Sequence, residues 1–217
     1  MQSNNKPSSF NSTLIGLPKN RSVEKVILFI ESYIEVFHKE YNITSNEKGL
    51  NHQFILCMNS YVGDETFFFH HENVEDPQNG NSAQSDIGVF IRGTQKAFFV
   101  LEAKRLDSTI QKYREKEYVL RDNGGGIERF KKEIHGIGLT YVGMIGYMQT
   151  DNFESWLEKI NAYIDEEILS SSSSELNWKD KDKLILEKSN KLFSTYKSQH
   201  QCKTKDISMY HIWIDLI

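Results

Sequence analysis

The stretch SDIGVFIRGTQKAFFVLEAKRL, residues 85–106, decides the fold because two apolar halves flank a polar turn, RGTQK at 92–96. This pattern is typical of a β-hairpin. Pairing symmetric about Thr94 gives four opposed pairs: Ile91 with Ala97, Val89 with Phe99, Ile87 with Leu101, and Asp86 with Glu102. We therefore expect two carboxylates to face each other at one end of the hairpin.

Both faces of this hairpin are apolar apart from that end. Side chains alternate along a strand, which assigns Gly88, Phe90, Phe98 and Val100 to one face and the other apolar residues to the opposite face. Strands buried on both faces are typical of the centre of a sheet covered by helices on each side. The sequence predicts an α/β fold with a mixed central β-sheet flanked by α-helices.

Four polar residues emerge together at the end of the hairpin: Gln84, Asp86, Glu102 and Lys104. Unpaired charge beside a core is costly, so the cluster has either a structural or a chemical explanation. In the structural one, Lys104 neutralises both acids. In the chemical one, the acids are oxygen ligands of Mg²⁺, and Lys104 orients or helps deprotonate a water and balances phosphate charge. Opposed carboxylates repel, and a metal compensates them better than one lysine, so we favour the metal site.

Asp86, a spacer and then Glu102-Ala103-Lys104 at the end of an apolar strand resembles the PD-(D/E)xK signature of restriction-endonuclease-like phosphodiesterases. Ser85 stands where that signature often has Pro. The resemblance covers roughly residues 47–148 and implies a restriction-endonuclease-like core. It also implies a Mg²⁺- or Mn²⁺-dependent nuclease with Asp86, Glu102 and the Ala103 carbonyl on the metal and Lys104 as a catalytic residue. DNA is the favoured substrate, RNA is left open, and a restriction or anti-phage defence system is the expected setting.

Two helices are predicted before the hairpin, at 22–41 and 47–62, from apolar residues spaced three and four apart. Glu47 lies in the first turn of the second helix, where an acid commonly complements the helix dipole. In the resembled nucleases a helix just before the sheet often contributes an additional acid to the metal site. Glu47 is therefore a candidate for either role.

Lysine and arginine are absent from 49–91 and gather between 92 and 132. This stretch is either a solvated face or a surface that follows a phosphate backbone. It contains the loop RDNGGG at 121–126 and a predicted helix at 127–135. Arg129 is the preferred phosphate contact because its planar guanidinium suits phosphate oxygens. The other candidate nucleic-acid contacts are Arg105, Lys131, Lys132 and Gln84.

The rest of the chain continues the α/β pattern. Strands are predicted at 66–73, 139–148 and 206–217, and helices at 152–169 and, weakly, at 107–120. A charged segment at 179–194 holds a possible short helix, and the serine run at 170–174 reads as a surface linker. Ser198, His200 and His211 are either substrate contacts or satisfied structural residues.

The length of 217 residues and the 38% hydrophobic content predict one globular domain at 21–217 after a loose arm at 1–20. No apolar run approaches the ~20 residues of a membrane span, no signal peptide is visible and there are only two cysteines, so we expect a cytoplasmic protein. With 26 basic and 30 acidic residues, the chain should bind DNA weakly by itself. We therefore expect a homo-oligomer or a partner protein subunit. The alternative is a non-catalytic member of the same fold that binds nucleic acid or protein.

Overall fold

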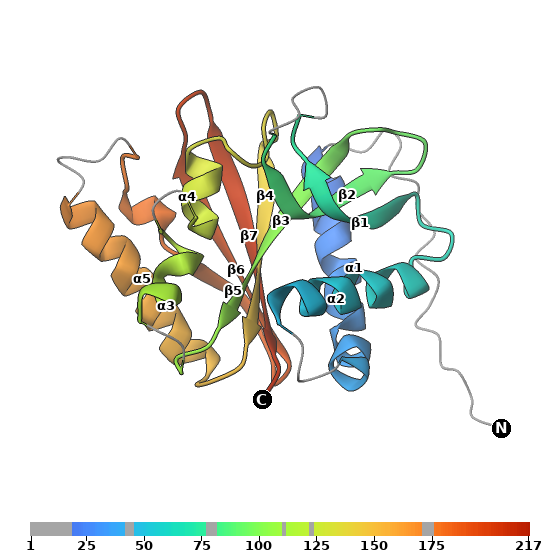
Figure 1. The fold of residues 1–217 in the computed structure, drawn as a ribbon, viewed down its shortest axis with the longest axis horizontal. Coiled ribbons are helices and arrows are strands. Elements are labelled where there is room, and N and C mark those ends of the chain that lie inside the picture. The colour runs from blue at the N-terminus through green and yellow to red at the C-terminus, as the bar shows by residue number, and fades with distance from the viewer. Residues whose placement is uncertain (1–18, 42–45, 77–81, 110–111, 122–123, 171–175) are drawn as a thin grey trace.

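A computed structural model describes residues 19–41, 46–76, 82–109, 112–121, 124–170 and 176–217, and its centre is one seven-stranded mixed sheet (Figure 1). The strand order is β1-β2-β3-β4-β7-β6-β5. Strands β3, β4 and β7 run parallel to one another, whereas β1 and β2 on one side and β6 and β5 on the other pair antiparallel. The predicted mixed α/β sheet is confirmed.

The strands are β1 (Phe67–Val74), β2 (Gln84–Ile91), β3 (Ala97–Leu106), β4 (Tyr141–Met148), β5 (Ile185–Ser189), β6 (Phe193–Gln201) and β7 (Asp206–Asp215). The helices are α1 (Lys19–Glu40), α2 (Glu47–Tyr61), α3 (Lys112–Glu115), α4 (Gly126–Lys131) and α5 (Phe153–Ser170). Two short 3₁₀ helices, η1 (Lys116–Tyr118) and η2 (Asp180–Asp182), complete the described elements.

Helices cover both faces of the sheet, as the apolar faces of the hairpin predict. Helices α1 and α2 pack on one face, with Ile30 and Phe54 in the same core as Phe99 and Leu101 of β3. Helices α4 and α5 and η1 lie on the other face, where Trp156 shares a core with residues such as Val100. Figure 1 shows the sheet between these two helical layers. Consecutive β3 residues therefore point into different cores, which fixes the face on which every side chain of the strand emerges.

The predicted elements before the hairpin and after it are confirmed within a few residues. Helix α2 begins at the predicted Glu47, and Asn46 caps it by accepting a hydrogen bond from the Gly49 N–H at 3.0 Å. The predicted helix at 127–135 is shorter and ends at Lys131. The weakly helical segment after the hairpin is one turn of α-helix followed by η1.

Two strands at the end of the chain were not predicted. The segment 179–194 contains η2, β5 and the first two residues of β6. Every residue of β5 is exposed, because it is the last strand of the sheet and pairs only with β6. Because neither face of β5 is buried, its sequence needs no alternation of apolar and polar residues that a pattern could detect.

The predicted arm at 1–20 lies outside the described residues as far as residue 18, and its last two residues begin α1. All but the first residue of the serine run also lies outside them. Among the described helices, none is both long and apolar enough to cross a membrane.

Candidate functional site

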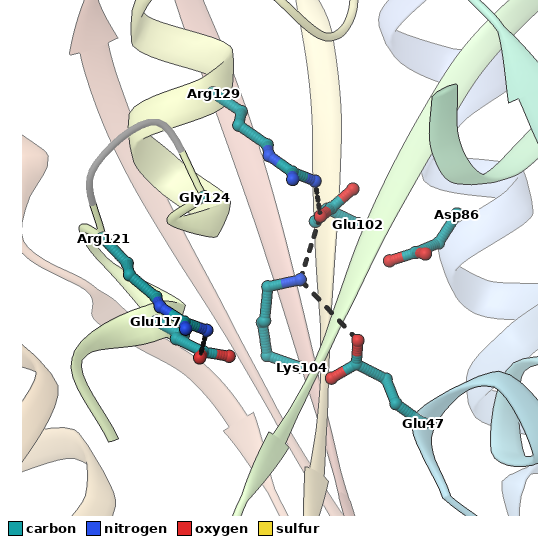
Figure 2. Close-up of a pocket in the computed structure, with 8 residues that line it drawn as sticks. All are labelled: Glu47, Asp86, Glu102, Lys104, Glu117, Arg121, Gly124 and Arg129. Carbon is teal, nitrogen blue, oxygen red and sulfur yellow. Dashed lines mark hydrogen bonds and ion pairs between the residues drawn. The ribbon is translucent and has the colours of Figure 1, made fainter. Parts of the chain in front are cut away.

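The carboxylates and the lysine of the hairpin meet in a cavity of about 560 Å³ on the face of the sheet that η1 and α4 cover. Asp86 comes from β2, and Glu102 and Lys104 come from β3 (Figure 2). The remaining lining residues are Glu47 at the start of α2, Glu117 of η1, Arg121 and Gly124 after η1, and Arg129 of α4.

The register of the hairpin explains why these side chains share a face. Ile87 pairs with Leu101, and Val89 with Phe99, as predicted. A shift between Val89 and Phe90 places Phe90 opposite Ala97, so the predicted pairing of Ile91 with Ala97 is wrong. A bulge of this kind inserts an extra residue into one strand and is invisible to an alternation pattern.

Asp86 is joined to β3 through its side chain. The paired backbone positions of the two strands end at Ile87 and Leu101, and the Ala103 N–H donates to Asp86 Oδ2 at 2.8 Å. Asp86 and Glu102, which were predicted to lie directly opposite each other, are therefore not among the paired backbone positions. Figure 2 nevertheless shows the Asp86 carboxylate turned toward Glu102 and Lys104.

Glu102 is the most strongly compensated acid of the cavity. Its Oε1 accepts hydrogen bonds from Lys104 Nζ at 2.9 Å and Arg129 Nη1 at 2.8 Å. His135 Nδ1 lies 3.1 Å from Glu102 Oε2, but the two atoms are not aligned for a hydrogen bond and neither has another partner among the described residues. Burial raises the pKa of Glu102, but Lys104, His135 and Arg129 outweigh burial and lower that pKa to about 2. Glu102 is therefore a carboxylate throughout the physiological pH range.

Asp86 behaves in the opposite way. Burial, followed by the negative charge of Glu102, raises the pKa of Asp86 to about 7, although Lys104 and the Ala103 N–H oppose the shift. Burial lowers the pKa of Lys104, yet the charges of Glu102, Glu47 and Asp86 outweigh burial and raise it above its ordinary value. Environments that push the pKa values of two neighbouring carboxyls apart are common at functional sites.

The raised pKa of Asp86 predicts a pH-dependent stability difference between wild type and Asp86→Asn. A carboxyl whose pKa is raised on folding holds more protons in the folded state, so it destabilises the fold increasingly as pH rises from about 4 to about 7. The amide keeps an acceptor for the Ala103 N–H but carries no charge. We expect the variant to be more stable at pH 8 by on the order of 2 to 4 kcal/mol, and no more stable near pH 4. Urea unfolding with a chelator present measures this, and equal stability at both pH values would contradict it.

Glu47 reaches the same cavity from the other side of the sheet. Its Oε1 lies 3.8 Å from Lys104 Nζ, and its Oε2 accepts from the Arg105 N–H at 3.3 Å. Among the described residues, no group of three or more His, Cys, Asp and Glu side chains is gathered closely enough to hold a metal ion. The structure thus brings Glu47 to the site without placing it in one ligand group with Asp86 and Glu102.

The donors at the hairpin fit a hard divalent cation in their chemistry. They are oxygens of Asp86, Glu102 and the Ala103 carbonyl, the ligand type that Mg²⁺ and Mn²⁺ prefer. The Ala103 carbonyl accepts from Lys104 Nζ at 3.0 Å, which places it beside the carboxylates. Glu102 Oε2 is a buried carboxylate oxygen whose near neighbour, His135 Nδ1 at 3.1 Å, makes no aligned hydrogen bond to it, so a bound cation would add to its compensation.

The predicted nucleic-acid contacts separate into two groups. Arg129 lines the cavity. Lys132 is partly exposed and pairs with Glu128 at 2.6 Å, Arg105 is half-buried beside Glu47, and Gln84 is exposed at the start of β2. Lys131 is corrected: its side chain is fully buried and its Nζ lies 2.6 Å from Asp182, so it is not a surface contact for phosphate.

Three residues of the site were not singled out from the sequence: His135, Glu117 and Arg121. Glu117 and Arg121 contact each other on the cavity wall formed by η1 and the residues after it. Their spacing of four along the chain, acid before base, was the available signal. His135 has no comparable signal, because its approach to Glu102 depends on how the chain after α4 folds back on β3.

No protein-family model matches this chain, and comparisons with curated proteins and with solved structures find no significant match.

Proposed function

We propose that this protein is a metal-dependent nuclease that hydrolyses phosphodiester bonds, with a site of the PD-(D/E)xK type. One observation carries the proposal: Asp86, Glu102 and Lys104 converge from adjacent strands in one cavity, with the Ala103 carbonyl beside them. The mixed sheet between two helical layers agrees with the core that the resemblance implies.

Each residue has a distinct role in this proposal. Asp86, Glu102 and the Ala103 carbonyl would hold Mg²⁺ or Mn²⁺, which supplies a Lewis acid and lowers the pKa of a bound water. The charges of Glu102, Glu47 and Asp86 raise the pKa of Lys104, so its ammonium would act as a hydrogen-bond donor and a positive charge toward phosphate and water. Arg129, partly exposed at the cavity, would contact a phosphate oxygen.

The second candidate is a non-catalytic binding protein of the same fold. The compensation of Glu102 favours it, because Lys104 and Arg129 already neutralise that carboxylate without a metal ion. Assays of supercoiled plasmid, linear duplex, single-stranded DNA and RNA, each with Mg²⁺, Mn²⁺ or a chelator, separate the two functions. The nuclease predicts metal-dependent cleavage of at least one substrate, DNA before RNA, and the binding protein predicts none.

We further propose that DNA binding by the single chain is weak, and that a second copy or a partner subunit delivers the substrate. Only Arg129 among the predicted basic contacts lines the cavity, while Lys131 is buried. A restriction or anti-phage system is a setting in which such a nuclease would be used.

Salt should therefore reduce cleavage by the dilute chain. Each neutralised phosphate releases counterions, so about three phosphate contacts lower affinity roughly 40-fold between ~50 and ~200 mM salt. We expect the cleavage rate at limiting DNA to fall by a comparable factor. Rapid digestion by a monomer at the higher salt concentration would rule out weak intrinsic binding.

A further inference from the structure

A continuous chain of seven polar side chains runs through the core on the α4 and α5 side of the sheet, and its members are all almost completely buried. In spatial order they are Trp213 and Tyr118, His211 and Ser198, His200 and Asp182, and finally Lys131. The distances between successive polar atoms are 2.9, 2.8, 2.8, 2.6, 2.5 and 2.6 Å. Each member therefore hydrogen-bonds its neighbours, and the chain has no gap.

The donor at one end of this row, Trp213, and the carboxylate of Asp182 near the other end allow only one donor-to-acceptor direction for its hydrogen bonds. The indole N–H of Trp213 can only donate, so Tyr118 Oη accepts from it and gives its own proton to His211 Nδ1. His211 must then carry its proton on Nε2 and donate to Ser198 Oγ. Ser198 donates in turn to His200 Nε2, which leaves a proton on His200 Nδ1 for the Asp182 carboxylate.

The reverse direction fails at both ends. It would leave the Tyr118 hydroxyl proton without an acceptor among these groups. In that direction His200 Nε2 would carry the proton and donate to Ser198. His200 Nδ1 would then either face the Asp182 carboxylate without a proton or need a second proton on the ring. Burial lowers the pKa of both histidines, and although Asp182 opposes the shift at His200, the result there is still a lowered pKa. Two neutral histidines of defined tautomer satisfy every contact.

Asp182, His200 and Ser198 have the order of a hydrolytic triad but not its accessibility. Ser198 is only 2% exposed, and its hydroxyl is held between His200 and His211. A nucleophile must meet a substrate, so this arrangement does not serve covalent catalysis. Of the two roles considered from the sequence, substrate contact or satisfied structural residue, Ser198, His200 and His211 therefore have the structural one.

This row of hydrogen-bonded side chains is attached to the η1 and α4 wall of the candidate site at two members, Tyr118, its second, and Lys131, its last. Tyr118 directly follows the wall residue Glu117 in η1, and Lys131 lies two residues after Arg129 in α4. Glu128 joins these two elements, since its Oε2 accepts from the Arg121 N–H at 3.0 Å and its own N–H donates to the Val119 carbonyl at 2.9 Å. The wall is thus one unit held by the polar chain at two points.

We propose that this one-way chain is a positioning device that fixes the η1 and α4 wall, including Arg129, against β6 and β7. Ser198 is its central link, because within the described ranges its hydroxyl alone hydrogen-bonds both histidines. The proposal goes beyond the nuclease function, and its tests do not require activity.

The first test is the tautomeric state of the wild type. Nitrogen-15 NMR of histidine-labelled protein at neutral pH should show His211 protonated only on Nε2 and His200 only on Nδ1. The opposite tautomers, or a doubly protonated ring at either position, would overturn the proposed direction. This result does not depend on whether any variant folds.

The second test compares Ser198→Ala with Ser194→Ala by amide hydrogen exchange. Ser194 lies on the same strand, is equally buried and hydrogen-bonds Ser189 at 2.6 Å, but it does not belong to the row of hydrogen-bonded side chains from Trp213 to Lys131. Ser198→Ala leaves a buried donor on His211 and a buried acceptor on His200, which should speed exchange at 116–121 and 124–132 by about tenfold or more. Faster exchange confined to these residues, and absent in Ser194→Ala, supports positioning. No local change, or the same change in both variants, refutes it.

Discussion

Glu102→Gln should reduce metal-dependent cleavage at least about 100-fold and also destabilise the fold. The amide is a poor ligand for a hard cation and cannot neutralise Lys104 and Arg129, which both contact Glu102 Oε1. Removing one partner of a buried ion pair typically costs about 3 to 5 kcal/mol, and the loss of repulsion with Asp86 offsets part of that cost. We expect a net destabilisation of roughly 2 to 3 kcal/mol at pH 7, measured by urea unfolding without metal.

The lowered pKa of Glu102 sets the pH window of this effect. A carboxyl whose pKa falls on folding contributes stability above its unfolded value of 4.5 and loses it as pH falls toward about 2. The matched control is Asp86→Asn, which should reduce cleavage at least as much as Glu102→Gln does but should stabilise the protein at pH 8. Loss of activity with the same sign of stability change in both variants would mean that the opposite environments of the two acids are described incorrectly.

Lys104→Met should lose most cleavage while retaining the affinity for Mn²⁺. The ammonium is a donor toward phosphate and water in the proposed site, and loss of such a group typically lowers a rate by about 100-fold or more. It is not a metal ligand, and its removal frees Glu102 from one of its cations. Titration calorimetry with Mn²⁺ and cleavage assays on the same preparation measure the two properties separately.

A suitable control is Lys48→Met, because Lys48 follows Glu47 in α2 but its side chain is 83% exposed. That variant should cleave as the wild type does. If Lys104→Met fails to fold, as judged by circular dichroism, Lys104 is mainly the counterion of a structural cluster. If it folds but binds no Mn²⁺, the assignment of the ligands is wrong.

Local patterns along the sequence predicted the centre of this fold well. The alternation at 85–106 predicted a hairpin whose inner pairs are confirmed, and it placed Asp86, Glu102 and Lys104 on one face. Alternation of apolar and polar residues can be recognised from consecutive residues alone, so it predicts a strand without knowledge of the elements that pack against it. The register shift after Val89 lies between these three residues and the turn at 92–96, so it does not change the face on which their side chains emerge.

Features that depend on distant contacts could not be predicted in the same way. Strand β5 is recognisable only through its pairing with β6, and the contact between His135 and Glu102 joins α4's end to β3. Lys131 is an exception, because it lies four residues after the fully buried Ile127 and hence on the same face of the helix. That spacing already indicated a buried lysine, which the proposal of a phosphate contact overlooked.

The most direct test of the central claim is cleavage of supercoiled plasmid in Mn²⁺ by wild type and Asp86→Asn purified in parallel. The variant keeps the hydrogen bond from Ala103 and should be at least as stable at pH 8, so a loss of activity cannot be attributed to unfolding. We predict that the wild type nicks or linearises the plasmid, that a chelator stops the reaction, and that the variant is inactive. Equal cleavage by both proteins, or no cleavage by wild type at low salt with either metal, would contradict a metal-dependent nuclease site at Asp86, Glu102 and Lys104.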